Sequence, residues 1–279
     1  MPVVFHADPV EFADAARDVS SRSPCSESLV AIWCAGLVRH PPAPEVSVLL
    51  ATAGSGGERA LAMRLGPNQL LLEHSDPGAA REIAHALADD GHAIPGVDGG
   101  AAACEAFAEV WRERTGRIAV ERVRLRHHVL EAVSPVRPAP GAARIADERD
   151  LAWLVAALDA FTGEAKVPRA PEGTESHVRA RLDERRYRVW EDAGVMSFLG
   201  ANLVDGRHAR IGPVWTPPAS RGRGYATALV AEASRELLAR GAPRVFLTTD
   251  LANPVSNAIY ARVGYRPVDD TVGLDFVDP

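Results

Sequence analysis

Apolar residues in the second half of the chain recur with a helical period in some stretches and a strand period in others. Leu151, Leu154, Val155 and Leu158 fall on one helical face, which predicts a helix over residues 151–161. The pattern then predicts a helix at 174–185, strands at 187–190, 195–204 and 209–215, a helix at 225–240, a strand at 245–248, a helix at 253–262 and strands at 265–268 and 272–277. This half is therefore predicted to be an α/β (α+β) domain.

The first half shows a similar order of elements with weaker periodicity. Its pattern predicts helices at 9–19, 27–39, 77–88 and 101–114, and strands at 46–51, 60–65, 69–73 and 118–133. Because both halves begin with two helices, three strands and another helix, we infer a structural duplication, although their direct sequence identity is slight.

A proline-rich segment separates the two halves. Residues 133–142 read VSPVRPAPGA, and three prolines in so short a stretch predict a stiff, extended linker. The expected organisation is an N-terminal domain over 1–135, a linker over 136–142 and a C-terminal domain over 143–279.

Composition narrows the class of protein. The chain has 279 residues, 47% hydrophobic and 24% charged, which is typical of a globular protein. Its net charge of −6 argues against non-specific nucleic-acid binding. The three cysteines, at 25, 34 and 104, form no CxxC pair, so neither a disulfide framework nor a structural zinc site is expected.

The same features give an expectation of location. The N-terminus lacks the pattern of a signal peptide, and the apolar stretch 28–38 is too short to span a bilayer. We expect a cytoplasmic protein without a metal, with neither nucleic acid nor membrane as a partner. The preference for arginine over lysine, together with abundant alanine, suggests a GC-rich bacterial genome.

The segment that carries chemistry is 214–226, VWTPPASRGRGYA, which lies between a predicted strand and a predicted helix. Gly222 and Gly224 allow a tight turn, and the helix that follows offers free N–H groups and a positive dipole end to a phosphate. Arg221 and Arg223 add positive charge. The alternative is a flexible glycine loop with solvated arginines. The segment does not match the GxGxxG motif of dinucleotide-binding proteins, because the third glycine is missing. It does not match a P-loop either, because the lysine of the GKS or GKT signature is missing.

These residues resemble the GNAT superfamily of N-acetyltransferases. RGRGYA at 221–226 matches the family pattern R/Q-x-x-G-x-G/A, and VWTPP at 214–218 is similar to the strand end before it. NPVSNAIY at 253–260, with Gly-Tyr at 264–265, resembles a downstream segment of the family. The resemblance covers about residues 142–279. Together with the inferred duplication, it implies two GNAT-like domains, each a mixed, mostly antiparallel central sheet flanked by helices.

The resemblance also implies an acetyl-CoA or other acyl-CoA donor and an amine acceptor, either a small molecule or a peptide. The amine would attack the thioester directly in a ternary complex. Tyr260 would protonate the departing thiolate, or else be a core aromatic residue, and Asn253 would contact the cofactor or only cap a helix. The implied cofactor-binding residues are Val214, Trp215, Thr216, Arg221, Gly222, Arg223, Gly224, Tyr225, Ala226, Asn253 and Asn257.

The sequence does not identify a general base. Four residues are candidates, and each has a simpler alternative role. Glu164 and Glu191 could instead be surface carboxylates, Asp250 a turn residue and His208 an ordinary, partly exposed histidine. The rival interpretation is therefore a non-catalytic acyl-CoA-binding or interaction module.

The first half lacks the arginine-glycine pattern. At the equivalent place, between Glu73 and Ala79, Asp76 is expected to cap a helix and to repel a pyrophosphate. The glycine run 96–100 is a second candidate loop that carries an aspartate. We expect this half to be a degenerate GNAT-like domain that binds no CoA and that shapes the acceptor site or mediates homodimer contacts.

Overall fold

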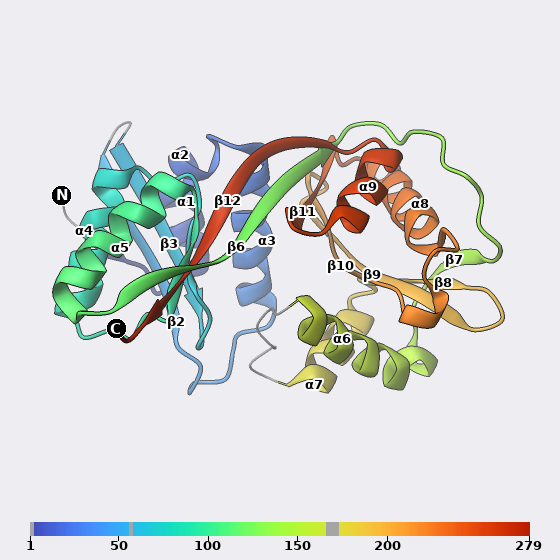
Figure 1. The fold of residues 1–279 in the computed structure, drawn as a ribbon, viewed down its shortest axis with the longest axis horizontal. Coiled ribbons are helices and arrows are strands. Elements are labelled where there is room, and N and C mark those ends of the chain that lie inside the picture. The colour runs from blue at the N-terminus through green and yellow to red at the C-terminus, as the bar shows by residue number, and fades with distance from the viewer. Residues whose placement is uncertain (1–2, 56–57, 166–172) are drawn as a thin grey trace. The chain divides into compact units, whose positions relative to one another are not determined.

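The computed structural model of the chain describes residues 3–55, 58–165 and 173–279 (Figure 1). The chain folds as two compact units. The first unit comprises residues 1–127, 250–252 and 269–279, and the second unit comprises 128–249 and 253–268. Within the described residues, none of the helices combines the length and apolar character that crossing a membrane requires.

Elements of the first unit begin with a short strand and a group of helices. They are β1 (Val3–Phe5), α1 (Pro9–Ala15), α2 (Arg17–Ser20), α3 (Pro24–Arg39), β2 (Val48–Ser55), β3 (Glu58–Leu65), β4 (Leu70–Leu72), α4 (Pro77–Asp89), β5 (Gly96–Gly99) and α5 (Ala101–Thr115). Strand β6 (Ile118–Leu130) begins in the first unit and ends in the second.

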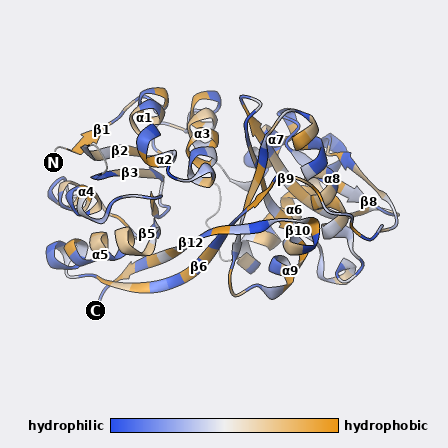
Figure 2. Ribbon diagram, turned by 90° about the horizontal axis from the view of Figure 1, so that it is seen from above, coloured by the Kyte–Doolittle hydropathy of each residue, from blue (hydrophilic) through white to orange (hydrophobic). Residues whose placement is uncertain are grey.

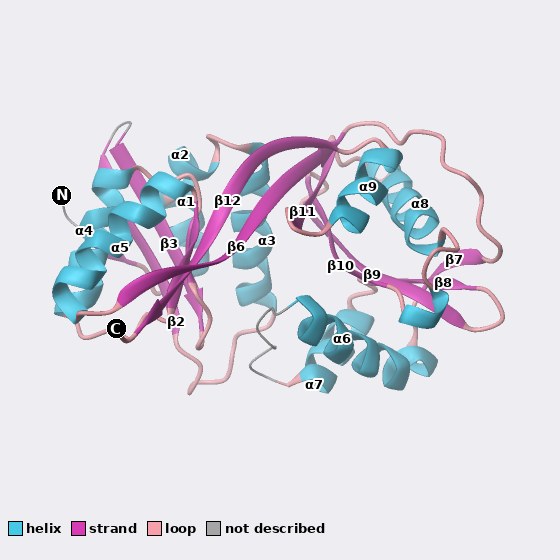
Figure 3. Cartoon of the chain, viewed as in Figure 1, coloured by secondary structure: helices cyan, strands magenta, loops and turns pink. Residues whose placement is uncertain are grey.

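The second unit repeats this order of strands. Its elements are β7 (Ala142–Ile145), a 3₁₀ turn (Glu148–Asp150), α6 (Leu151–Ala165), α7 (Thr174–Asp183), β8 (Tyr187–Glu191), β9 (Val195–Val204), β10 (His208–Trp215), a 3₁₀ turn (Pro218–Ser220), α8 (Tyr225–Ala239), β11 (Arg244–Asp250) and α9 (Pro254–Val263) (Figure 3). Strand β12 (Arg266–Val277) begins in the second unit and ends in the first.

The two units have the same topology. In the first unit, β1, β2, β3 and β4 pair antiparallel in sequence, and α4 connects β4 to its parallel neighbour β5. In the second unit, β7, β8, β9 and β10 pair antiparallel in sequence, and α8 connects β10 to its parallel neighbour β11. The predicted mixed, mostly antiparallel sheet is confirmed, and the repeated topology agrees with the inferred duplication.

Apolar side chains cover both faces of the strands in each unit. Along β3 the alternation of a strand sends Ala60 and Ala62 into a cluster with α4 and α5, and Leu61 and Met63 into a cluster with α1 and α3. In the second unit, α8 and α9 supply one cluster and α6 and α7 the other. Figure 2 shows hydrophilic and hydrophobic stretches along β12, as expected for a strand that is only partly buried.

The last strand differs from expectation. Residues 272–277 were expected to close the C-terminal domain, but Val272–Asp275 pair antiparallel with Gly96–Gly99, and residues 269–279 belong to the first unit. The run Gly96–Gly99 is therefore strand β5 and not a loop. Glycine is required there because a Cβ on Gly96 would lie 2.2 Å from the carbonyl oxygen of Leu274. The predicted linker, 136–142, packs on the second unit, where Trp190 Nε1 donates to Pro140 O at 2.6 Å.

Candidate active site

Strand β10 carries a bulge in the middle of the predicted site. Its antiparallel register with β9 shifts between Ile211 and Val214. The parallel pairing of β10 with β11 that the structure describes ends at Arg210 opposite Phe246, before the bulge. Because β10 continues to Trp215, the edge of its last residues is left for an extended ligand that pairs with the main chain.

Gly200 makes room for this bulge from the neighbouring strand β9. A Cβ on Gly200 would lie 2.5 Å from the carbonyl oxygen of Gly212, an approach that a backbone atom cannot relieve by rotation. The bulge therefore depends on a glycine at a position that the sequence pattern assigns simply to a strand.

We expect Gly200→Ala to lower the free energy of unfolding by about 1–3 kcal/mol, since the strands must separate to admit the methyl group. Urea unfolding of the full chain measures this loss. Gly163→Ala is the matched control, because Gly163 lies in α6 with nothing within 4 Å of the position that an added methyl group would take, and alanine is the better helix former. Equal stability of Gly200→Ala and the wild-type protein would show that the bulge tolerates a side chain.

The loop after β10 leads into an uncapped helix. Gly222 and Gly224 have φ angles of 77° and 86°, in the left-handed region that glycine adopts without strain. Within the described part of the chain, no side chain caps α8, and the same holds for α2, α5 and α7, whereas side-chain oxygens cap α1, α3, α4 and α9. The first N–H groups of α8 are therefore available to an anion, and this arrangement fits the pyrophosphate of a coenzyme A donor.

Arg221 is held beside this loop by two partners. Its Nε donates to the carbonyl oxygen of Thr216 at 2.9 Å, and its Nη2 pairs with Glu164 Oε2 at 2.7 Å. Trp215 Nε1 donates to the other Glu164 oxygen at 3.1 Å. These bonds connect the end of β10 with the phosphate loop through Glu164 of α6. Three predicted cofactor-binding residues, Trp215, Thr216 and Arg221, therefore lie close together.

Two of the base candidates are held by arginine. Burial acts to raise the pKa of Glu164, but the hydrogen bonds from Arg221 and Trp215 outweigh it, so the pKa lies below its usual range. The hydrogen bond from Arg144 lowers the pKa of Glu191. A carboxylate with a lowered pKa is a weaker proton acceptor, so neither residue suits the role of general base in this arrangement.

The other two base candidates stand at the ends of strands. Asp250 accepts a hydrogen bond from the backbone N–H of Ala252 at 2.8 Å, which confirms the turn role that was its alternative. His208 is half-buried at the start of β10, the end of that strand opposite to Trp215.

Tyr260 lies on α9 inside an aromatic group. It is 7% exposed, its ring centroid is 6.1 Å from that of His128 and 6.0 Å from that of Tyr265, and burial raises its pKa to about 12. A phenol with that pKa keeps its proton at neutral pH. Tyr260 shares one apolar cluster with Tyr225, the first residue of α8.

Both asparagines predicted to contact the cofactor take part in the cap of α9. Asn253 Oδ1 accepts from the backbone N–H of Ser256 at 3.0 Å, so the capping role is observed, and Asn257 Nδ2 donates to the carbonyl oxygen of Asn253 at 2.8 Å. The cap occupies Asn253 Oδ1, so this oxygen is engaged within the helix. Contact of either asparagine with a cofactor stays a prediction.

Sequence reasoning missed two side chains that support the site. Ser197 on β9 is fully buried, donates to the carbonyl oxygen of Trp215 at 3.0 Å and accepts from Thr216 Oγ1 at 2.9 Å. Asp192 accepts from the hydroxyl of Tyr225 at 2.5 Å. A lone hydroxyl residue within the apolar run VMSFL was the available signal for Ser197.

The equivalent place in the first unit is closed to phosphate. Asp76 Oδ1 accepts from the backbone N–H of Ala79 at 3.0 Å, which confirms the predicted cap of α4. Glu73 follows β4 as Thr216 follows β10, is 2% exposed, and accepts from Ser26 Oγ at 2.6 Å. Asp76 thus caps the helix whose counterpart in the second unit has free N–H groups, and Glu73 places a second carboxylate at the position of Thr216. Both carboxylates would repel an anion.

Comparisons with known proteins find a family that part of the chain resembles. Residues 152–265 match the model of the acetyltransferase (GNAT) family. No curated protein matches the chain.

Three solved structures share the fold over nearly the whole chain. An acetyltransferase of the GNAT family from Colwellia psychrerythraea is 13% identical, with 99% of each chain covered and a TM-score of 0.62. A GCN5-related N-acetyltransferase from Sphaerobacter thermophilus is 18% identical, with 98% of this chain and 94% of that chain covered and a TM-score of 0.62. A tandem GNAT protein from the clavulanic acid biosynthesis pathway is 17% identical, with coverages of 98% and 97% and a TM-score of 0.59. Residues 152–265 therefore resemble the acetyltransferase (GNAT) family, and over its whole length the chain has the fold of solved GNAT proteins.

Proposed function

We propose that the second unit is an acyl-CoA-dependent N-acyltransferase that transfers an acetyl group from acetyl-CoA to a primary amine. The observation that carries the proposal is the uncapped N-terminus of α8, reached through two left-handed glycines at the end of a bulged strand. Free N–H groups there would hold the pyrophosphate, and the open edge of β10 would pair with the pantetheine arm. Arg221 and Arg223 would add charge to the same phosphates.

The chemistry would be direct attack by a neutral amine on the bound thioester. A main-chain N–H at the end of β10 would stabilise the oxyanion that develops on the carbonyl, and Tyr260 would give its proton to the departing thiolate. Because Glu164 and Glu191 are engaged by arginine, the proton of the ammonium form would leave through water. The acceptor would be a small amine or a peptide N-terminus met in the cytoplasm, with no metal needed.

Thiol release from acetyl-CoA, followed with a panel of amines, tests the proposal. We expect thiol release that depends on the amine, because attack and departure occur in one ternary complex. The matched condition is the same protein and acetyl-CoA without amine, which reports background hydrolysis. Binding of acetyl-CoA without thiol release for any amine would favour the rival function, a non-catalytic acyl-CoA-binding module.

A further inference from the structure

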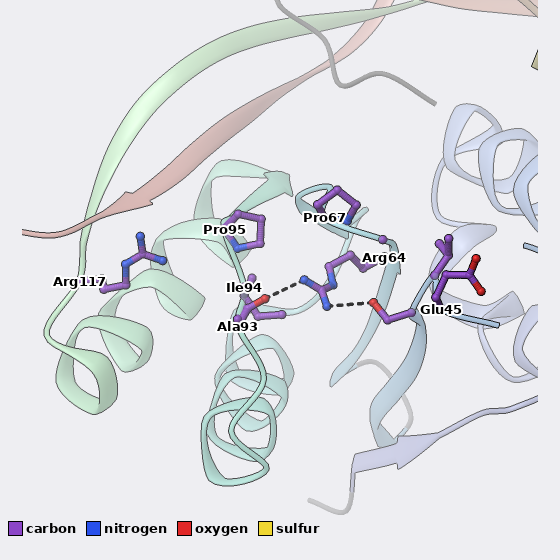
Figure 4. A pocket seen from close by; sticks show the side chains of 10 residues that line it. Glu45, Arg64, Pro67, Ala93, Ile94, Pro95 and Arg117 are labelled. Atoms are coloured by element: carbon purple, nitrogen blue, oxygen red, sulfur yellow. Dashed lines mark hydrogen bonds between the residues drawn. The ribbon is translucent and has the colours of Figure 1, made fainter. Parts of the chain in front are cut away.

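The first unit contains a cavity that the proposed transfer does not use. It measures about 500 Å³ and lies among the segment before β2, the turn after β3 and the segment between α4 and β5 (Figure 4). These segments stand at the ends of β4 and β5 where the strands begin, whereas the turn equivalent to the phosphate loop, 73–76, follows the end of β4. The cavity is therefore at the other end of these strands from the degenerate loop.

Arg64 lines this cavity from strand β3. By the alternation of the strand it follows Ala60 and Ala62, two fully buried residues that face α4 and α5. The row of apolar side chains thus ends in an arginine, and this residue is only 9% exposed. A buried cation normally requires an anionic partner, because desolvation of an isolated charge is costly.

The contacts of Arg64 are all with neutral groups. Nη1 donates to the carbonyl oxygen of Ala93 at 2.7 Å, and Nη2 reaches Ser47 Oγ at 3.5 Å (Figure 4). Nε is enclosed and finds no hydrogen-bond partner among the described residues. Burial lowers the pKa of this guanidinium. By contrast, the buried Arg188 in the second unit forms two hydrogen bonds with Glu236.

The rest of the lining is apolar with one charge of each sign. Ile94 and Pro95 form part of the wall, and Arg117 adds a second cation that pairs with Asp278, whose side chain is 86% exposed. Glu45, which is exposed, is the carboxylate in the lining. The ion pair between Arg117 and Asp278 is exposed to water and does not involve Arg64. The positive charge of Arg64 is therefore not balanced by a neighbouring carboxylate.

We propose that this cavity binds a small monocarboxylate with an apolar body. The carboxylate would lie on the guanidinium of Arg64, where a planar fork of N–H donors matches it, and the apolar body would lie against Ile94 and Pro95. The volume suits a small organic molecule. A dianionic phosphate fits less well, since one buried cation faces the ligand and Glu45 stands in the same lining.

Binding of benzoate and hexanoate to the full chain, followed by ligand-observed NMR and by thermal shift, tests the proposal. We expect both probes to bind and to raise the melting temperature, with inorganic phosphate at least tenfold weaker. Arg64→Met should weaken both carboxylates at least tenfold, while the ligand-free variant is as stable as the wild-type protein or more so, because the unpaired buried charge is gone. Arg81→Met, which removes an exposed arginine that pairs with Glu109 outside the cavity, should change nothing.

Arg64→Lys keeps the charge without the fork and serves if the methionine variant folds poorly. We expect it to bind the carboxylates more weakly than the wild-type protein but more tightly than Arg64→Met. The proposal would be overturned if neither probe binds, if phosphate binds as tightly as the carboxylates, or if Arg64→Lys and the wild-type protein bind them equally. Acetyl-CoA turnover plays no part in these measurements, so they stand or fall separately from the proposed transfer.

Discussion

Replacing Gly224 with valine should weaken acetyl-CoA binding about 100-fold. Gly224 has a φ angle of 86°, which costs a residue with a side chain on the order of 1–2 kcal/mol and a β-branched residue more. In the free variant the loop is expected to leave the left-handed conformation at residue 224. Binding of acetyl-CoA must then restore this strained turn, which directs the N–H groups of α8 toward the phosphate, and the cost of doing so weakens binding. Each hydrogen bond to a charged group that is lost adds about 1.5–3 kcal/mol, and a tenfold change in affinity corresponds to about 1.4 kcal/mol.

Calorimetric titration of the wild-type protein and the variant with acetyl-CoA measures this change. One site per chain is expected for the wild-type protein, because Asp76 already occupies the N-terminus of α4. A Cβ at Gly224 would meet only Ala139 Cβ, at 3.8 Å, so the first atom of the new side chain fits without a clash. Gly116→Val is the control for strain alone, since Gly116 ends α5 in the first unit with a φ of 77° and open space around it.

Either of two results would contradict this account of the loop. Two equal sites per chain would mean that the first unit also binds the donor despite the carboxylates of Glu73 and Asp76. If Gly224→Val binds acetyl-CoA as tightly as the wild-type protein and the control Gly116→Val do, the phosphate is held elsewhere. The first result would revise the role of the first unit, and the second would revise the site.

Local patterns account for the parts of the fold and site that were predicted. The phosphate loop and α8 are contiguous in sequence, and their glycines, arginines and helical face all lie within residues 221–240. The caps of α4 and α9 were equally readable, because Asp76 and Asn253 each precede a proline at the first turn. Signals of this kind need no knowledge of the tertiary fold.

Features that depend on distant partners were not predictable from these patterns. The pairing of β12 with β5 joins residues that are more than a hundred positions apart. Gly96 and Gly99 indicate a loop in the sequence, and only the fold shows that they admit the closely packed strands β12 and β4. The contact of Glu164 with Arg221 crosses 57 positions. The short strands β1 and β7 have three and four residues, too few for a period to be recognised.

Tyr260→Phe should lower kcat about 100-fold or more while leaving the dissociation constant of acetyl-CoA unchanged. Removing a general acid typically costs 10²–10⁴-fold in rate. Burial raises the pKa of Tyr260 to about 12, so the hydroxyl keeps its proton at neutral pH and has one to give to the thiolate, while the raised pKa makes it a weaker acid than an exposed phenol. Phenylalanine keeps the ring in its place beside His128 and Tyr265, so donor binding should survive. Thiol release and calorimetry on the same preparation separate the two quantities.

Tyr265→Phe is the matched control, because Tyr265 is buried in the same aromatic group and its hydroxyl is bonded to Ser234 Oγ at 2.9 Å. Its loss should reduce stability by about 1 kcal/mol and leave kcat unchanged. If both variants lost kcat equally, the effect would come from packing of the cluster and not from proton transfer. If Tyr260→Phe kept its kcat, the thiolate would leave unprotonated or take its proton from water. Because burial raises the pKa of Tyr260 to about 12, we expect any loss of activity between pH 8 and 10 to come from another group.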